Sequence, residues 1–237
     1  MRFPLAPCRA WLFAALAVAA VGVRPAGAQP AFTYGDTLTA LMRPVVNLPA
    51  LVVAGETFQA WALAPQAQTG FTAQLELSTN IHPLGVETAT YDAARARWIL
   101  TLRVPAGVPE ELYDLVLGGN GLAADRSVNA VKVLEAEPTD YYFIQVSDTH
   151  LVTHLYYYEP GADTDTTEMA DFRAVIDDIN IIHPAFVLHT GDLVNEGELE
   201  EFLGRYYSSR SQALFAALAL PHFLVSGNHD QPGWDST

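Results

Sequence analysis

FIQVSDTH (residues 143–150) is the first of three stretches that decide the fold of the second half of this chain. The other two are FVLHTGD (residues 186–192) and FLVSGNHD (residues 223–230). Each begins with an apolar run rich in β-branched and aromatic residues and ends in small, acidic or imidazole-bearing residues. Such runs are typical of buried strands in a parallel sheet. Because ligands gather outside the carboxyl ends of parallel strands, we expect the three polar ends to meet at one place.

The side chains brought to this place are expected to bind metal ions. They are those of Asp148, His150, Asp192, Asn228 and His229, with Asp230 directly after. Oxygen ligands mixed with imidazole suit divalent ions such as Mn, Fe and Zn. An aspartate after a strand can also cap a turn, and Asn228, His229 and Asp230 can satisfy local backbone groups or cap a helix. Three such motifs in succession favour the metal site. His189, inside its strand, is expected to pack, or to support the ligands without contacting the metal, rather than to bind metal.

These motifs carry a resemblance to a known family. Asp148-Thr149-His150, Gly191-Asp192 with Gly197, and Gly227-Asn228-His229-Asp230 resemble the first three motifs of the calcineurin-like metallophosphoesterase superfamily. The resemblance covers about residues 141 to 230 and implies the first half of a four-layer α/β/β/α sandwich. It implies two divalent metal ions: Asp148 and His150 bind one, Asp192 bridges both, and Asn228 binds the second. It also implies that the catalytic residue His229 protonates the leaving group or steadies the phosphoryl oxygens, held by Asp230.

The chain departs from the family pattern in two ways. Purple acid phosphatases, a branch of the superfamily, resemble DxG and GDxxY, whereas His150 and Asn195 stand at those positions here, so a ferric purple centre is not implied. The family also has further metal-binding histidines, including a GHxH motif, that are not found before Thr237. The second metal therefore keeps only Asp192 and Asn228, fewer than the three protein ligands of a usual catalytic site. We expect a truncated metallophosphoesterase domain that is inactive by itself.

The N-terminus has the pattern of a secretory signal peptide over residues 1–28. Arg2 and Arg9 precede an apolar run from Trp11 to Val23, and Ala26-Gly27-Ala28 offers a small-residue cleavage site. The run of about 13 apolar residues is shorter than the roughly 20 that cross a bilayer, which favours a cleaved leader over an N-terminal anchor. We expect a secreted or periplasmic protein with no membrane span after the leader is removed.

The net charge of the chain limits the classes of partner that we expect it to bind. The chain has 27 acidic and 12 basic residues, a net charge of −15. Arg2, Arg9 and Arg24 lie in the leader, so 9 basic residues remain and the net charge becomes −18. Such a surface is unsuited to nucleic acid or to anionic lipid. A small phosphoester held by bound metal remains compatible with it. The single cysteine, Cys8, also lies in the leader, so no disulfide is expected.

Residues 29–137 have the pattern of an antiparallel β-sandwich of the immunoglobulin or fibronectin type. Apolar residues alternate with polar ones, as Trp98, Leu100, Leu102 and Val104 show, and turn signals separate the runs. Glu135 to Thr139 form a linker, after which residues 138–237 alternate strands with helices. An apolar stripe predicts a first helix that ends before Pro184, and a second helix is expected at about 198–218. The members of the stripe are Met169, Phe172, Val175, Ile176, Ile179 and Ile182.

Two functions are compatible with these patterns. The first is a secreted two-metal phosphoesterase that hydrolyses phosphomonoesters or phosphodiesters with a metal-bridging hydroxide. The second is an exported β-sandwich module that binds protein or carbohydrate, joined to an inactive hydrolase remnant. An isolated histidine and a GHxH stretch encoded beyond Thr237 would distinguish the first function from the second.

Overall fold

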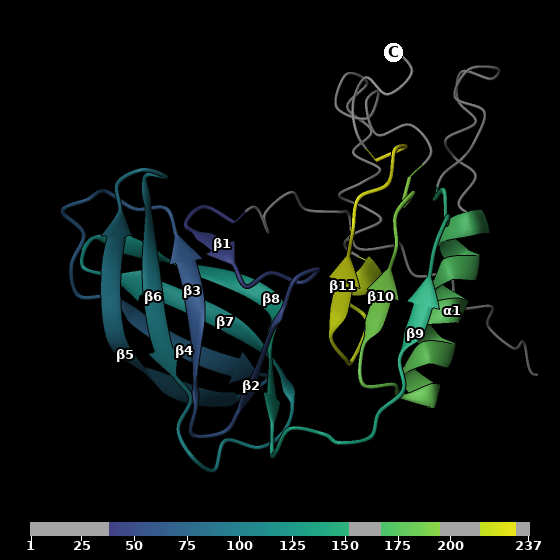
Figure 1. Cartoon of the computed structure of the whole chain (residues 1–237), viewed down its shortest axis with the longest axis horizontal. Coiled ribbons are helices and arrows are strands. Elements are labelled where there is room, and N and C mark those ends of the chain that lie inside the picture. The colour runs from purple at the N-terminus through teal and green to yellow at the C-terminus, as the bar shows by residue number, and fades with distance from the viewer. Residues whose placement is uncertain (1–37, 152–166, 195–213, 231–237) are drawn as a thin grey trace, which may run out of the picture. The chain divides into compact units, whose positions relative to one another are not determined.

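The computed structural model describes residues 38–151, 167–194 and 214–230 (Figure 1). The leader expected over residues 1–28 lies outside these ranges. So does most of the helix expected at 198–218: of its residues only 214–218 are described, and of these only Leu214 and Phe215 are helical. Asn195 and Gly197, which follow Gly191-Asp192 in the second motif, also lie outside the described ranges.

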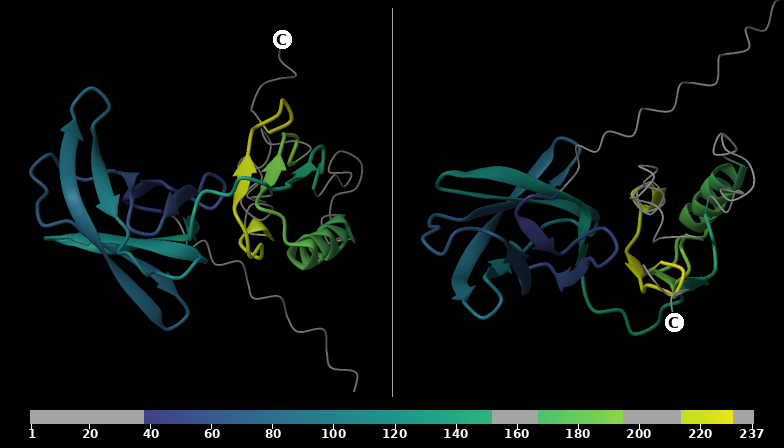
Figure 2. Two further views of the ribbon diagram at one scale, coloured as in Figure 1. Left: turned by 60° about the horizontal axis from the view of Figure 1, so that its bottom comes forward. Right: turned by 90° about the horizontal axis from the view of Figure 1, so that it is seen from above.

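Eight strands between residues 41 and 134 form one sheet in the order β1-β3-β6-β5-β4-β7-β8-β2. The long strand β5 is shared by the two halves of this sheet: residues 80–84 pair with β4, and residues 85–92 pair with β6. The sheet therefore curls, as Figures 1 and 2 show. The strands are β1 (Leu41–Arg43), β2 (Ala50–Val53), β3 (Thr57–Ala62), β4 (Thr72–Leu77), β5 (Asn80–Asp92), β6 (Arg97–Arg103), β7 (Leu112–Gly119) and β8 (Leu122–Leu134).

Alternation of side chains builds the core of this sheet. In β6, Trp98, Leu100 and Leu102 are buried while the residues between them are partly exposed. The period-two pattern of the sequence thus identified the inward face correctly. All strand pairs are antiparallel, as predicted, except β2 with β8, which is parallel. The sequence could not show this exception, because alternation reports the face of a residue and not the direction of its neighbouring strand. The immunoglobulin or fibronectin type stays a prediction.

A buried aspartate on β8 holds the start of the first strand. One carboxylate oxygen of Asp125 accepts hydrogen bonds from the backbone N–H groups of Thr39, Ala40 and Leu41, at 3.0, 2.8 and 2.7 Å. Asp125 is only 7% exposed. A buried carboxylate is costly unless it is hydrogen-bonded, and three backbone donors supply that compensation here.

Three short parallel strands form a second sheet in the order β11-β10-β9. They are β9 (Ile144–Val146), β10 (Val187–His189) and β11 (His222–Leu224). Residues 144, 187 and 222 stand in register, so all three carboxyl ends lie at one edge of the sheet. The parallel direction was predicted. The strands are shorter than the apolar runs that predicted them, because the ends of those runs already lie in loops.

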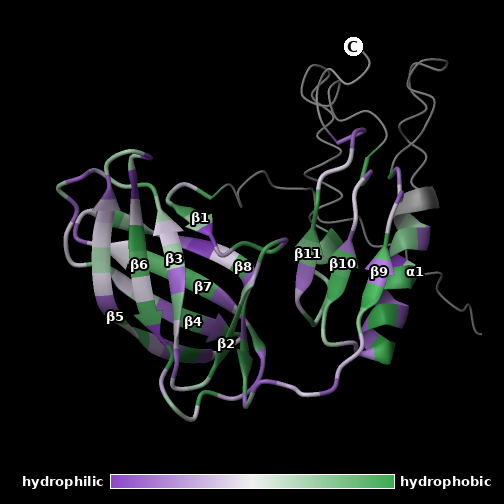
Figure 3. Cartoon of the chain, viewed as in Figure 1, coloured by the Kyte–Doolittle hydropathy of each residue, from purple (hydrophilic) through white to green (hydrophobic). Residues whose placement is uncertain are grey.

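The helix α1 (Thr167–Ile182) connects β9 to β10 and packs on one face of this sheet. Phe172, Ile176 and Ile179 are buried, and apolar and polar stretches alternate along the helix in Figure 3. Val175 and Ile182 are 42% and 52% exposed, so the predicted stripe was too wide. Spacing places these two residues near the apolar face, but the neighbouring segments do not cover them. Among the residues that the structure describes, no helix is long and apolar enough to span a bilayer.

A buried histidine begins β11. His222 is 1% exposed and its ring stacks on Phe215, with centroids 3.8 Å apart. Neither ring nitrogen has a hydrogen-bond partner within the described ranges. Burial, with a smaller contribution from His189, lowers the pKa of His222 to about 3. The ring is therefore neutral near pH 7 and serves as a packing element.

Candidate metal centre

The loops that follow β9 and β10 run side by side beyond the sheet. The backbone N–H groups of Asp148, His150 and Leu151 donate to the carbonyls of Gly191, Asp192 and Leu193, at 3.1, 3.0 and 2.8 Å. We call residues 147–151 the first loop and residues 190–194 the second loop. Because this ladder continues the parallel pairing, it fixes the register between the two loops.

Three side chains of these loops form a group that could hold a metal ion. Asp148, His150 and Asp192 each offer one ligand atom, and these atoms lie within 4.8 Å of one another. Asp148 is exposed and the other two are partly exposed, so solvent can reach the group. Two carboxylates and one imidazole, with room for water, are a donor set that fits a divalent ion of the Mn, Fe or Zn type.

The backbone around this group is unusual. Asp148, His150 and Asp192 all have positive φ angles, of 54, 41 and 52°. An L-residue in this left-handed region is disfavoured, and residues held there cluster at functional sites. The three candidate ligands therefore occupy a conformation that the surrounding contacts must impose.

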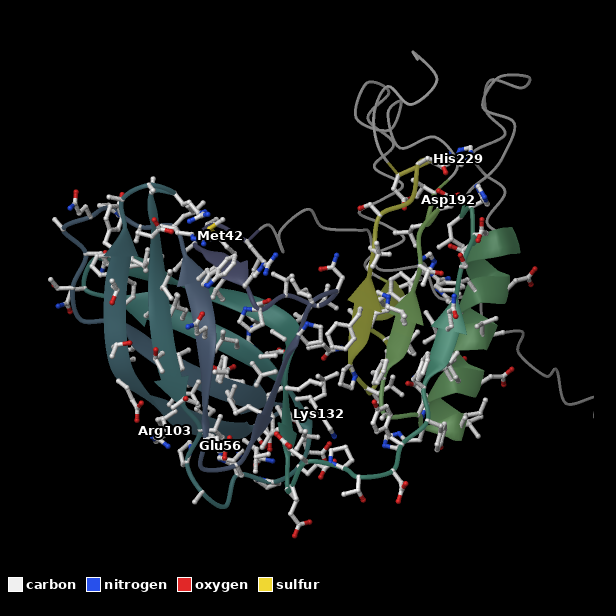
Figure 4. The ribbon with its side chains drawn as sticks, viewed as in Figure 1. Met42, Glu56, Arg103, Lys132, Asp192 and His229 are labelled. Atoms are coloured by element: carbon white, nitrogen blue, oxygen red, sulfur yellow. The ribbon has the colours of Figure 1, made fainter. Side chains whose placement is uncertain are left out.

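A third loop, residues 226–230, follows β11 and joins the other two. The backbone N–H of His229 donates to Oδ1 of Asp192 at 3.0 Å, and the His150 and His229 rings lie 4.9 Å apart. Figure 4 shows Asp192 and His229 together beyond the ends of β10 and β11. Asn228 lies in the same loop and is exposed. Side chains predicted from three separate motifs thus gather at one edge of the sheet.

Glycines allow the second and third loops to approach this closely. A Cβ atom on Gly191, which has a φ of +110°, would lie 2.8 Å from both the Cα and the N of Gly227. A Cβ on Gly227 would lie 2.5 Å from the backbone N of Asp192. Real Cβ atoms do not approach backbone atoms so closely, so neither position has room for a side chain.

The carboxylate of Asp230 connects the second and third loops. Its Oδ1 accepts from the N–H of Val194 at 3.0 Å, and its Oδ2 accepts from the N–H of Gly227 at 2.9 Å. The sequence suggested that Asp230 orients His229, and that role stays a prediction. The observed contacts give Asp230 a different task, because they fix the backbone on either side of the candidate ligands.

His189 is buried below the loops and is not a member of the ligand group. Its ring lies against Phe215, with centroids 5.7 Å apart, and burial lowers its pKa from the ordinary value. This agrees with the packing role expected from its place inside a strand.

Comparison with known proteins gives a family match over one part of the chain. Residues 141–236 match the family described as calcineurin-like phosphoesterase. These residues include all six candidate site residues, which supports the superfamily suggested by the motifs. No curated protein sequence gives a match.

Two similar solved structures cover the chain in part. One is purple acid phosphatase PPD1 from yellow lupin (Lupinus luteus), at 14% identity and a TM-score of 0.37, covering 83% of this chain and 38% of that one. The other is SGBP-B of the Bacteroides ovatus mixed-linkage glucan utilization locus, in complex with a heptasaccharide. It has 18% identity and a TM-score of 0.27, covering 48% of this chain and 26% of that one. The chain thus spans well under half the length of either protein.

Proposed function

We propose that this protein is a metal-dependent phosphoesterase whose centre is built at the ends of β9, β10 and β11. The observation that carries the proposal is the convergence of Asp148, His150 and Asp192, with ligand atoms within 4.8 Å of one another. The family match over residues 141–236 supports the same reaction class. Asp148, His150 and Asp192 would hold one ion, and Asp192 with Asn228 would contribute to a second.

The chemistry follows from this arrangement. Bound divalent ions would lower the pKa of a water molecule and offset negative charge on the phosphoryl oxygens. Asp192 suits the bridging role because β10 is the central strand, so the second loop lies between the first and the third. The His229 N–H holds one Asp192 oxygen in place. A ring nitrogen of His229 would donate the proton that the leaving oxygen needs.

Metal binding by the 237-residue chain is the direct test. Equilibrium dialysis against Mn²⁺ or Zn²⁺ should find one ion per chain, and Asp148→Asn should weaken binding strongly because it removes an anionic ligand. Asp177→Asn is the matched control. Asp177 is exposed on α1, so this substitution removes the same charge away from the site. No binding by the unchanged chain, or equal loss in both variants, would contradict the proposal.

Hydrolysis is the second test. Release of nitrophenol from nitrophenyl phosphate and from bis-nitrophenyl phosphate, with and without added metal, distinguishes a monoesterase from a diesterase. Metal-dependent release that Asp148→Asn abolishes supports the phosphoesterase. Because residues 1–237 are expected to be inactive by themselves, the assay uses the full-length protein. Tight metal binding by that protein without hydrolysis of either ester favours instead the binding module joined to an inactive remnant.

We also propose that the protein is exported, on the strength of the leader pattern in residues 1–28. Expression with a natural secretion system should yield a mature protein that begins at Gln29. N-terminal sequencing of the extracytoplasmic fraction measures this, and an intact Met1 in that fraction would contradict cleavage.

A further inference from the structure

The residue between the two candidate ligands of the first loop has its own partners. The hydroxyl oxygen of Thr149 lies 3.1 Å from Nε2 of His189 and donates to the carbonyl of Leu193, also at 3.1 Å. His189 belongs to β10, and Leu193 belongs to the second loop. The side chain of Thr149 therefore connects the first loop to the strand and the loop that carry Asp192.

The hydrogen bonds of His189 define which nitrogen carries the proton. The backbone N–H of Gly191 donates to Nδ1 at 3.3 Å, so Nδ1 must be unprotonated. In a neutral ring the proton then stands on Nε2 and is donated to Thr149. The hydroxyl proton of Thr149 goes on to Leu193. All three bonds run in one direction, and both ring nitrogens of His189 and the hydroxyl proton of Thr149 have a partner.

Burial makes this arrangement stringent. His189 is 0% exposed, so no solvent is at hand to replace a lost partner. Removing the hydroxyl would leave the Nε2 proton of His189 unpaired in the interior, which is more costly than losing one exposed hydrogen bond. The connection between the loops is therefore specific to a hydroxyl at position 149.

The connection lies where the backbone needs support. Asp148 and His150, on either side of Thr149, and Asp192, next to Gly191, are the three residues with left-handed φ angles in the ligand group. Such conformations persist only when surrounding contacts impose them. With Thr149 anchored inward, the side chains of its two neighbours belong to the group that could hold a metal ion.

We propose that Thr149 and His189 are positioning residues that lock the first and second loops in the conformation that aims Asp148, His150 and Asp192 at one divalent cation. The cation in this statement rests on the proposed function, whereas the locking of the loops does not. In metal sites generally, removing a group that holds a metal ligand in place changes the metal affinity about 10- to 100-fold.

A matched pair of substitutions tests the proposal. Thr149→Val keeps the branched shape and removes the hydroxyl, and Thr149→Ser keeps the hydroxyl. With Co²⁺ as the probe, Thr149→Val should bind roughly 10- to 100-fold more weakly and change the visible absorption spectrum of the bound ion, while Thr149→Ser should stay close to the unchanged chain. Equal affinities and equal spectra for Val and Ser would overturn the proposal.

Two measurements on the metal-free chain keep the proposal independent of the proposed function. Nitrogen-15 NMR of the His189 ring should show the proton on Nε2, and a proton on Nδ1 would overturn the proposal without any variant. Amide exchange at His150 and Leu151 should accelerate in Thr149→Val and not in Thr149→Ser; unchanged exchange in both would overturn it as well. If the unchanged chain binds no Co²⁺, the proposed metal centre fails, and the metal-free measurements still decide whether the loops are locked.

Discussion

Gly191→Ala should unfold the first, second and third loops. The structure gives the expected size of the effect and a control substitution. Gly191 has a φ of +110°, and a Cβ there would lie 2.8 Å from the Cα and N of Gly227. Gly107 has a similar φ of +91°, but a Cβ there would meet nothing within 4 Å. The two substitutions thus share the conformational strain and differ in the steric contact.

The expected magnitudes follow from these two causes. Strain alone costs about 1–2 kcal/mol for an L-residue in the left-handed region, which is the expected loss for Gly107→Ala. Forcing an extra carbon into a filled space adds typically 1–3 kcal/mol. Gly191→Ala should therefore lose roughly 2–5 kcal/mol, the higher part applying because the contacted atoms are backbone and cannot rotate away.

Segment-resolved hydrogen exchange is the suitable assay, because it reports the two regions separately. Peptides that contain residues 147–151, 190–194 and 226–230 should lose protection in Gly191→Ala and keep it in Gly107→Ala. The same variant should lose affinity for Mn²⁺, since the contact between His229 N–H and Asp192 depends on the approach of the two loops. If Gly191→Ala costs no more than Gly107→Ala, the close approach of Gly191 to Gly227 does not hold the site together.

Three further predictions follow from other contacts. In the full-length protein, Asp192→Asn should lose metal and activity together. His229→Ala should keep its metal and lose turnover by about 10²–10⁴, less for a nitrophenyl diester than for an alkyl ester; equal defects on both esters would exclude proton donation by His229. Asp125→Ala leaves three backbone N–H groups without their acceptor, so urea unfolding followed by tryptophan fluorescence should show a loss of about 1–3 kcal/mol, and an unchanged midpoint would contradict this. Burial lowers the pKa of His222 from 6.5 to about 3. Between these pH values the unfolded chain binds one proton more than the folded chain. The free energy of unfolding should therefore fall by roughly 1.4 kcal/mol for each pH unit as the pH drops. His222→Phe should lack this contribution when its pH profile of stability is compared with that of the unchanged chain.

The sequence predicted the gathering of the candidate ligands because one rule of parallel sheets was enough. Three apolar runs, each followed by polar residues, place Asp148, Asp192 and His229 at the same edge whatever the lengths of the connecting segments. The direction of β9, β10 and β11 and the buried face of α1 followed from the same patterns. This prediction did not require any distance between the residues.

The contacts that hold these residues could not be predicted in the same way. Thr149 and His189 are 40 residues apart in the sequence, and Asp230 and Val194 are 36 apart. Local patterns of polarity do not report which distant backbone group a side chain meets. The contacts of Asp230 with the backbone N–H groups of Val194 and Gly227 are therefore additional to the expected role toward His229, which stays a prediction. The exposure of Val175 and Ile182 has the same origin, since it depends on what covers the helix.

The wide sequence separation of the contacts in the centre bears on the order of events during folding. The hydrogen bonds that join the three loops link residues between 36 and 44 positions apart. Contacts of this range require large loops to close first, so they form late, after α1 and the hairpins of the first sheet. An ion that needs ligands from both the first and the second loop would then find no binding site in the folding transition state. It should slow unfolding and leave the refolding rate unchanged. Stopped-flow kinetics with and without Mn²⁺ would reveal the opposite order as faster refolding.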